Sequence, residues 1–412
     1  MKTIGAAADD ARGPVRWNPY DRAIYASPYE AYRRLREEAP IYYDEEYDFF
    51  AVSRYEDVKR VLRDSETFTS LRGDVLELLK ADFEMPPGMF IYEEAPEHTI
   101  HRGLMTRVFT PKRMAALEPA MRAYCGAALD PFLGEGKFDF VANLGTEMPM
   151  RVIGMLLGIP EQEQKRIQRY LNEAIVSNEK GVMSASKDTM SGEIFAEYVD
   201  WRVKNPSDDL MTQLLYTEFT DANGERKTLR RDQVLIFVNI LAGAGNDTTN
   251  RLIGWIGKTL ADHPDQRRDI YQNRALIPQA IEEVLRFEPP PYQVARYVER
   301  DAEFHGVTVP AGSAIVALPA AANRDQRVFA NGDGFDIHRD RQANLSFGFG
   351  LHSCLGNVLA RSEGRVALDE ILKRFPEWEI DIDNVRLAST TGVRGWDAMP
   401  AYVVGAGSGA GR

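Results

Sequence analysis

The sequence predicts a mostly α-helical protein with a minor β component, arranged as one large domain around a long central helix. Two observations carry this prediction. From Tyr55 to about Leu285, apolar residues recur at spacings of three and four, which is the period of an amphipathic helix. Stretches with strand character are short and lie on either side of that region. Because no repeat and no linker separates strands from helices, one fold that contains both is the simplest arrangement.

The N-terminal segment predicts a helix and two strands. Residues 1–15 are small, charged and interrupted by Gly and Pro, so we expect a loose tail there. Residues Pro28–Ala39 have helical spacing. The apolar stretches Ile41–Tyr43 and Phe49–Val52 follow, and they predict short strands around an acidic turn.

The central region is expected to be divided into several helices by glycine and proline. The stop signals within it are Gly88, Pro111, Pro160, Pro206 and Pro264. Near its end, an apolar run from Gln233 to Leu260 contains no proline. A helix over that run would be long enough to cross much of the molecule.

The C-terminal third predicts strands, a glycine-rich loop and a last long helix. Strand character is found in Val294–Val298, Glu303–Val309 and Ala314–Leu318. The glycine-rich loop Phe347–Gly356 precedes a predicted helix from about Asn357 to Phe375, and short strands return after it.

Residues 16–404 are expected to form the domain, and residues 405–412 a flexible glycine-rich tail. This tail half-resembles a dinucleotide-binding fingerprint. That fingerprint works only where a helix follows and presents its N-terminus to a pyrophosphate, and no helix follows here.

Composition narrows the classes of protein. The chain has 412 residues and a mass of 46.4 kDa, with 44% hydrophobic and 27% charged residues, which is the balance of a globular enzyme. Two cysteines, Cys125 and Cys354, exclude a disulfide framework and fit a reducing compartment. No apolar run approaches the ~20 residues that cross a bilayer, and the N-terminus has no signal-peptide core. We therefore expect a cytoplasmic protein without a membrane anchor, and a monomer.

The net charge of −12 disfavours nucleic acid as a partner, because an acidic surface repels phosphates. One segment is basic although the chain as a whole is acidic. His98–Leu117 contains no Asp or Glu. Its basic side chains are Arg102, Arg107, Lys112 and Arg113. The stretch is either an ordinary solvated face or a surface for an acidic partner.

The strongest chemical signal is the loop around Cys354, which lies just before the predicted helix at Asn357. Backbone N–H groups and a helix N-terminus favour a thiolate. A thiolate without clustered cysteines or histidines is a poor zinc site, but it suits a single axial bond to haem iron. The alternative is a buried, inert cysteine, and that is our interpretation of Cys125, which lies among small and apolar residues.

A second signal lies inside the long apolar run. Gly243 and Gly245 each cost about 1 kcal/mol relative to alanine in a helix, which suggests that something bulky approaches this face. Thr248 can bond back to a carbonyl and bend the helix. Asp247 beside it completes an acid and a hydroxyl, the parts of a proton relay. The alternative is a face of small residues that only packs against another helix.

The pattern Phe347-x-x-Gly350-x-His352-x-Cys354-x-Gly356 resembles the haem-ligand signature of the cytochrome P450 superfamily, of the soluble bacterial type. Matching pieces extend from about residue 28 to 400. The resemblance implies a haem-thiolate domain in which Cys354 binds the iron. It also implies the following further cofactor-binding residues: His98, Arg102, Arg296, His352, Phe347, Gly348, Gly350, Gly356 and Ala244.

The resemblance assigns three more roles. Thr248 and Asp247 match the threonine and acid that deliver protons to bound dioxygen. Glu283 and Arg286 match a buried structural pair, whereas on spacing alone they could be an exposed ion pair worth a few tenths of a kcal/mol. The substrate pocket would include Phe90, Ile91, Ile240, Gly243, Tyr292, Val294 and Val393, and these apolar residues imply a hydrophobic substrate.

The implied activity is monooxygenation: insertion of one oxygen atom into a hydrophobic small molecule, or its dealkylation. The implied cofactor is haem b (iron protoporphyrin IX), with dioxygen as co-substrate and NAD(P)H electrons delivered by ferredoxin reductase and ferredoxin. An acidic ferredoxin would explain the basic stretch His98–Leu117, together with Arg361 and Arg365. The alternatives are a haem-thiolate enzyme of other chemistry (a peroxygenase or an oxidative coupling enzyme), a non-catalytic haem-binding protein, or a helical scaffold with an inert Cys354.

The chain departs from the common pattern at four places. Glu94-Ala95-Pro96 replaces Asp-Pro-Pro, and Ile100 stands where arginine is frequent. Asn246 stands where histidine is common, and Asp340 where proline often occurs. None of these positions is the cysteine, the acid–alcohol pair or the Glu283/Arg286 pair.

Overall fold

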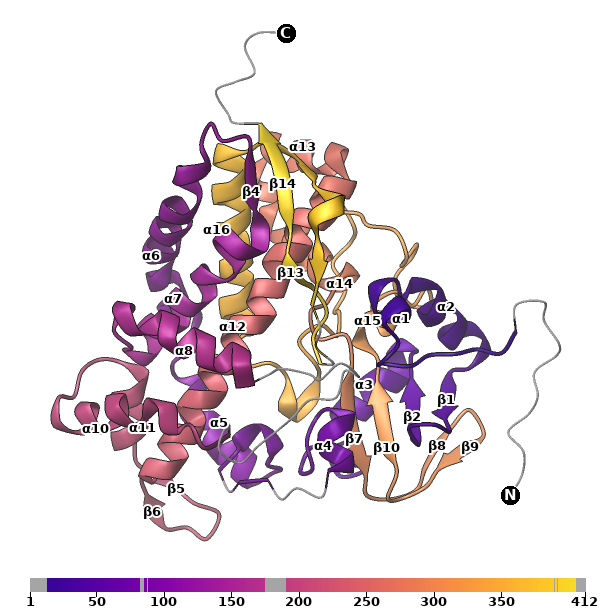
Figure 1. Ribbon diagram of the computed structural model, residues 1–412. Helices are drawn as coiled ribbons and strands as arrows, with labels where there is room; N and C mark the ends of the chain where they lie inside the picture. Colours follow the sequence, from indigo (N-terminus) through magenta and orange to yellow (C-terminus); the bar gives the residue numbers. More distant parts are fainter. Residues whose placement is uncertain are drawn as a thin grey trace.

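A computed structural model describes residues 13–81, 85–86, 88–174, 190–388, 390 and 392–404. The tails predicted over 1–15 and 405–412 lie outside this part of the chain, except for residues 13–15. Figure 1 shows a body of helices and, beside it, a smaller region rich in strands. The predicted fold class, mostly α with a minor β component, is confirmed.

The α-helices include short N-terminal ones and long central and C-terminal ones. They are α1 (Arg22–Ala26), α2 (Tyr29–Glu38), α3 (Tyr55–Arg63), α4 (Leu76–Lys80), α5 (Glu97–Thr106), α6 (Pro111–Leu129), α7 (Glu147–Leu157), α8 (Glu161–Ala174), α10 (Ala196–Lys204), α11 (Leu210–Tyr216), α12 (Arg231–Asp262), α13 (Pro264–Gln272), α14 (Ile277–Phe287), α15 (Pro319–Ala322) and α16 (Asn357–Arg374).

The strands are short throughout. They are β1 (Ile41–Asp44), β2 (Phe49–Val52), β3 (Phe68–Thr69), β4 (Lys137–Asp139), β5 (Phe219–Thr220), β6 (Arg226–Lys227), β7 (Val294–Val298), β8 (Ala302–Phe304), β9 (Val307–Val309), β10 (Ala314–Ala317), β11 (Glu377–Ile380), β12 (Arg386–Leu387), β13 (Trp396–Ala398) and β14 (Pro400–Val404).

The long helix α12 forms the axis of the helical body. Its 32 residues cover the predicted run from Gln233 to Leu260 and extend it at both ends. Residues are buried along nearly its whole length, because α7, α14 and α16 pack around it. A helix that is buried on many sides needs apolar residues on more than one face. This explains why the run from Gln233 to Leu260 has no continuous polar face.

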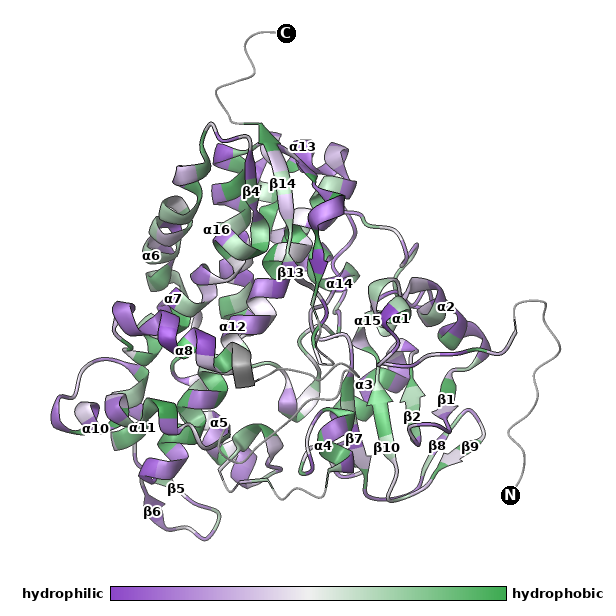
Figure 2. Cartoon of the chain, in the orientation of Figure 1, coloured by the Kyte–Doolittle hydropathy of each residue, from purple (hydrophilic) through white to green (hydrophobic). Residues whose placement is uncertain are grey.

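The larger sheet has the strand order β1-β2-β10-β7-β3. β10 pairs with β2 in parallel, and the other neighbours are antiparallel. All four residues of β10 are buried, and the strand is hydrophobic in Figure 2, as a central strand covered on both faces must be. The pairing of Ile315 with Arg296 fixes the place of Arg296 on β7.

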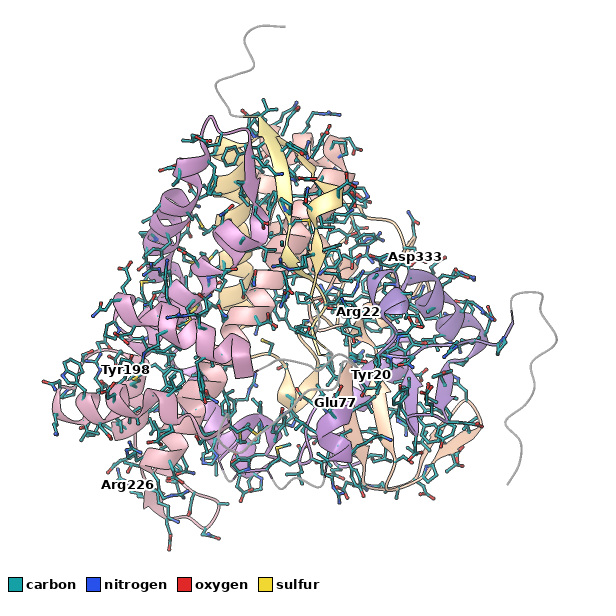
Figure 3. The ribbon with its side chains drawn as sticks, in the orientation of Figure 1. Tyr20, Arg22, Glu77, Tyr198, Arg226 and Asp333 are labelled. Atoms are coloured by element: carbon teal, nitrogen blue, oxygen red, sulfur yellow. The ribbon has the colours of Figure 1, made fainter. Side chains whose placement is uncertain are left out.

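A buried charge ties the N-terminal helices to the rest of the fold. Arg36 of α2 is 1% exposed, donates to the carbonyl of Ala321 (3.0 Å) and reaches Asp333 (3.4 Å). Figure 3 labels Asp333 above α2. Because a buried charge is costly unless it is paired, these contacts fix where α2 lies.

Three local features differ from the sequence predictions. Pro111 and Pro264, expected as stop signals, are the first residues of α6 and α13, a position that tolerates the missing N–H. Phe140–Gly145 forms a π-helix, and β5 and β6 form a small hairpin within the region expected to be helical. None of the described helices combines the length and apolar character required to cross a membrane.

Candidate functional site

A cavity of about 350 Å³ lies between α12, β7, α5 and the cysteine loop 347–356. A volume in this range can hold a ligand of small-molecule size. The lining is mostly apolar, with a few charged and hydroxyl side chains. Of the residues predicted to bind a cofactor, the cavity is lined by His98, Arg102, Ala244, Arg296, Phe347, Gly348, His352, Cys354 and Gly356.

The cysteine loop is held in a tight turn by its own backbone. The N–H of Cys354 donates to the carbonyl of Phe347 (2.7 Å). Gly348 and Gly350 have φ of 69° and 76°, which side chains rarely adopt. A Cβ on Gly350 would also lie 3.0 Å from the Cα of Arg63, so this glycine is not a lining residue but the point where the loop meets α3.

Cys354 lines the cavity. The residue is exposed, and because it borders the cavity, the cavity accounts for that exposure. Burial by the surrounding protein raises the pKa of the Cys354 thiol, whereas the N–H of Gly356 and the charges of Arg102 and Arg361 act in the opposite direction. α16 begins three residues later, so its N-terminus also favours negative charge near the sulfur.

Two arginines line the same cavity. Arg296 is 5% exposed, and within the described part of the chain its one hydrogen bond is to the carbonyl of its neighbour Ala295 (2.8 Å), with no ion pair. Arg102 donates to the carbonyl of Ser353 (2.6 Å). Burial lowers the pKa of both groups. Asp74 and Glu94 oppose this effect at Arg296 from a distance, and because neither forms an ion pair with it in the described structure, an anion in the cavity would further stabilise the buried guanidinium.

Two histidines lie beside these arginines. The rings of His98 and His352 are 4.5 Å apart. The Nδ1 of His98 is buried without a hydrogen-bond partner in the described structure, and burial lowers the pKa of His98 to about 4. Together the orphaned nitrogen, the two arginines and the lone sulfur fit a flat cofactor that carries carboxylates and takes one thiolate ligand, which is the chemistry of haem.

The wall opposite the cysteine loop comes from α12. Ala244, Gly245, Thr248 and Thr249 line the cavity there. The hydroxyl of Thr248 donates to the carbonyl of Ala244 (2.9 Å), one helical turn earlier. A Cβ on Gly245 would meet Ile153 at an ordinary van der Waals distance of 3.5 Å, and Ile153 lines the same cavity.

Asp247 lies in a charged cluster beside the cavity and is not among the residues that line it. Its carboxylate accepts from Arg251 (2.9 Å), which also pairs with Asp397 (2.9 Å) and donates to the carbonyl of Trp396. Burial raises the pKa of Asp247, and Arg251 opposes that effect. Asp247 is therefore next to Thr248 in the sequence, but its carboxylate pairs with Arg251. Arg251 in turn pairs with Asp397 on β13.

Glu283 and Arg286 form a buried pair behind the cysteine loop. Arg286 donates from Nε and from a terminal nitrogen to Glu283 (2.8 and 2.7 Å), and both side chains are at most 5% exposed. Arg286 also donates to the carbonyls of Asn323, Gly332 and Gly334. The pair thus holds the chain segments around 323–334 against α14.

The predicted substrate-pocket residues divide into two groups. Phe90, Ile91, Ile240 and Val294 line the cavity. Gly243, Tyr292 and Val393 do not.

Tyr292 packs instead in the hydrophobic cluster of the strand-rich region. Its ring contacts that of Tyr25 at 5.7 Å. Val393 forms a bridge with Pro291, and its carbonyl accepts from Tyr25. The resemblance placed Tyr292 and Val393 in the pocket, but in the structure both pack against Tyr25 of α1 instead.

Sequence reasoning missed several residues of the site. Asp74 and Ser70 line the cavity from the segment before α4, and Ile153 lines it from α7. No local pattern marks them, because they come from segments distant in the sequence. Glu94 contacts His352 (3.2 Å), and its only signal was its departure from the common Asp-Pro-Pro pattern.

Comparisons with known proteins agree with this geometry. The family model for cytochrome P450 matches residues 161–392. Cytochrome P450 123 of Mycobacterium tuberculosis is 36% identical over 393 residues, covering 94% of this chain and 96% of that protein. Vitamin D(3) 25-hydroxylase of Pseudonocardia autotrophica is 31% identical over 394 residues, with the same coverage of 94% and 96%.

A solved structure is similar along nearly the whole chain. Cytochrome P450 CYP109Q5 from Chondromyces apiculatus has a TM-score of 0.83 and 32% identity, covering 94% of this chain and 98% of that one.

Proposed function

The chain belongs to the cytochrome P450 family, whose members are monooxygenases, and we propose from that premise that it oxidises a hydrophobic small molecule held in the cavity beside Cys354. The oxidation inserts one oxygen atom or dealkylates the substrate, with electrons supplied by a ferredoxin and its NAD(P)H-dependent reductase. The observation that carries the proposal is that Cys354, Thr248, Arg102 and Arg296 line one cavity although they come from four segments of the chain.

Haem b, when bound, supplies an iron that accepts electrons and activates dioxygen. Cys354 would hold the iron as a thiolate, and the nearby charge of Arg102 and the N–H of Gly356 stabilise that charge state. Arg296, Arg102, His98 and His352 would bind the two propionates, because they are the cations and donors that the cavity contains.

Thr248 and Asp247 of α12 would deliver protons to the cavity. The Thr248 hydroxyl donates to the carbonyl of Ala244, which leaves its oxygen free to accept from water in the cavity. Asp247 would supply protons to this hydroxyl and is held by Arg251 until it does so. A group of raised pKa next to a site suits general acid catalysis.

The substrate is proposed to be apolar and largely uncharged, such as a terpenoid, steroid, fatty or aromatic compound. Phe90, Ile91, Ile240, Val294 and Ile153 supply apolar contact area around the cavity. The vitamin D(3) 25-hydroxylase among the relatives acts, by its name, on a molecule of this class.

The electron donor is proposed to bind the basic surface around α6 and α16. Arg107, Lys112 and Arg365 are exposed on it. Two other residues of the predicted patch are already paired: Arg361 with Glu282 (2.5 Å) and Arg113 with Asp208 (3.8 Å). Charged surfaces of this kind steer association with an acidic partner, so we expect the reduction rate to fall as salt is raised.

The first experiment is the absorption spectrum of the reduced protein with carbon monoxide, for wild type, Cys354→Ser and Cys125→Ala. We expect a strongly red-shifted Soret band that Cys354→Ser abolishes and Cys125→Ala, the matched control, retains. A colourless protein that also fails to take up added haem would overturn the proposal. Turnover that needs NAD(P)H and redox partners, and does not proceed on peroxide alone, separates monooxygenation from peroxygenation.

A further inference from the structure

We propose that Glu93 and His101 form a positioning pair for substrate selection: their contact holds the short turn Phe90–Tyr92 in the wall of the cavity. This inference rests on the proposed function, because the ligand that meets this wall is the substrate. Neither Glu93 nor His101 lines the cavity, so the pair acts through the turn. It sets how well the cavity accepts apolar ligands that are large enough to reach the wall.

The turn depends on side-chain contacts for its position. Phe90–Tyr92 is a 3₁₀ helix of three residues, and two of them, Phe90 and Ile91, line the cavity. The backbone bond that ends it, from the N–H of Glu93 to the carbonyl of Phe90, is long at 3.4 Å. So short a 3₁₀ helix forms few backbone hydrogen bonds, and their geometry is poor. Contacts with neighbouring elements therefore decide where the turn lies.

Glu93 follows the turn directly and joins it to α5. Its Oε2 lies 2.6 Å from the Nδ1 of His101. The side chains of Glu93 and His101 are 18% and 11% exposed, so water competes weakly for this bond. A carboxylate can only accept, so Nδ1 donates, which it can do in a neutral ring as well as in a protonated one. The contact therefore requires no particular charge on His101.

The ring of His101 is fixed by aromatic neighbours. It meets Phe237 of α12 edge-on, with ring centroids 5.5 Å apart, and Phe219 of β5 at 5.8 Å. Figure 1 shows β5 close to α5, and residues of the two elements are in contact. Phe237 also packs edge-on against Phe90 at 5.0 Å. Glu93, His101, Phe237 and Phe90 thus form a closed set of contacts that ties the turn to two long-range partners, α5 and α12.

The other end of the turn is held separately. The hydroxyl of Tyr92 donates to Asp74 (2.9 Å), which lines the cavity. Loss of the contact between Glu93 and His101 would leave this end in place and release the opposite one, so Phe90 and Ile91 would occupy their positions in fewer molecules. The apparent affinity for a ligand that needs the wall falls by the same fraction.

The test measures the affinity of the haem-loaded protein for two probes from the shift of the Soret band. Imidazole is small and reports iron coordination alone. Clotrimazole carries its imidazole on a carbon with three aryl rings, and this bulky group must meet the walls of a cavity of about 350 Å³. We expect Glu93→Ala and His101→Phe each to weaken clotrimazole binding roughly 10-fold and imidazole binding by less than about 2-fold.

Further variants separate positioning from general damage. His101→Phe keeps a ring between Phe219 and Phe237 and removes only the hydrogen bond. Glu93→Gln keeps an acceptor for Nδ1 and should bind clotrimazole nearly as wild type does. The double variant Glu93→Ala/His101→Phe should bind it no more weakly than the single variants, because residues that act through one contact are not additive. Glu97→Ala is the matched control, since Glu97 is exposed in the first turn of α5.

Hydrogen exchange over residues 88–94 tests the contact without haem. Amide exchange there should be faster in Glu93→Ala and His101→Phe and unchanged in Glu97→Ala. Wild-type clotrimazole affinity in both single variants, equal weakening of both probes, additive losses in the double variant, no recovery in Glu93→Gln, or unchanged exchange would overturn this inference alone. Wild-type protein that takes up no haem would overturn the proposed function, and the exchange rates would still show whether the contact holds the turn.

Discussion

Glu363 on α16 is expected to make the stability of this protein fall as pH rises. Its side chain is 1% exposed, and within the described structure its Oε2 has no hydrogen-bond partner. Burial raises the pKa of Glu363 from 4.5 to about 8, and no cation opposes that shift. The perturbation is Glu363→Gln, which keeps the shape of the side chain and removes its charge.

The magnitude follows from linkage. Between pH 4.5 and about 8 the folded protein holds a proton on Glu363 that the unfolded chain has lost, so folding becomes less favourable as pH rises. Each pH unit in that window costs about 1.4 kcal/mol, or roughly 3 kcal/mol between pH 5 and pH 7. The stability contributed by Glu363 is complete below pH 4.5 and lost above about 8.

The assay is denaturant unfolding of wild type and Glu363→Gln at pH 5, 7 and 9, with equal haem loading. Burying the amide of the variant costs about 1–3 kcal/mol at every pH. The informative quantity is therefore how the difference in unfolding free energy between the two proteins changes with pH. That difference should move in favour of the variant by roughly 3 kcal/mol from pH 5 to pH 7, by about 1 kcal/mol more up to about pH 8, and then level off.

Glu370, two turns further along α16, is the matched control. It accepts from Lys373 (2.7 Å), Arg374 (2.7 Å) and Arg122 (2.8 Å). Burial acts to raise the pKa of Glu370, but these bonds lower it overall from its ordinary value of 4.5. The stability that Glu370 contributes is therefore present above pH 4.5 and is lost only as the pH falls below that value. Glu370→Gln should be destabilising by the same amount from pH 5 to pH 9. A pH-independent difference for Glu363→Gln would refute the reasoning.

Three other predictions test the site. Glu283→Ala leaves the buried Arg286 without its partner and should cost about 3–5 kcal/mol in denaturant unfolding; an unchanged midpoint would contradict a structural role. Gly350→Ala should destabilise by about 1–3 kcal/mol because it combines positive φ with a contact to the α3 backbone, whereas Gly356→Ala, with negative φ and no close neighbour, should be mild. Thr248→Ala should lower the fraction of oxygen consumption that yields product, measured as product formed per oxygen used; unchanged coupling would remove Thr248 from proton delivery.

Much of the site was predictable because its signals are local. The loop around Cys354 combines positive-φ glycines, a cysteine and a helix start within ten residues, and each of these has its own physical requirement. The long helix was predictable for the same reason, since apolar periodicity without proline determines a helix wherever it lies. The pairing of Glu283 with Arg286 follows from their spacing, but their burial does not.

The partners of the acidic residues were not predictable. Asp247 is next to Thr248 in the sequence, yet its carboxylate belongs to a cluster that Arg251 forms with Asp397, 146 residues further on. The spacing of four would allow the Arg251 contact on any helix, but only the packing of β13 against α12 brings in Asp397.

The sequence by itself determined the fold class, the glycine-bracketed cysteine loop before a helix and the acid–hydroxyl pair on the long helix, because each depends on residues within a few turns of one another. The tertiary structure decided which apolar residues line the cavity and which charged groups meet there. It placed the side chain of Tyr292 in the core of the strand-rich region and brought the carboxylate of Glu94 into contact with the ring of His352. Such contacts depend on the packing of segments hundreds of residues apart, and a local pattern holds no information about that packing.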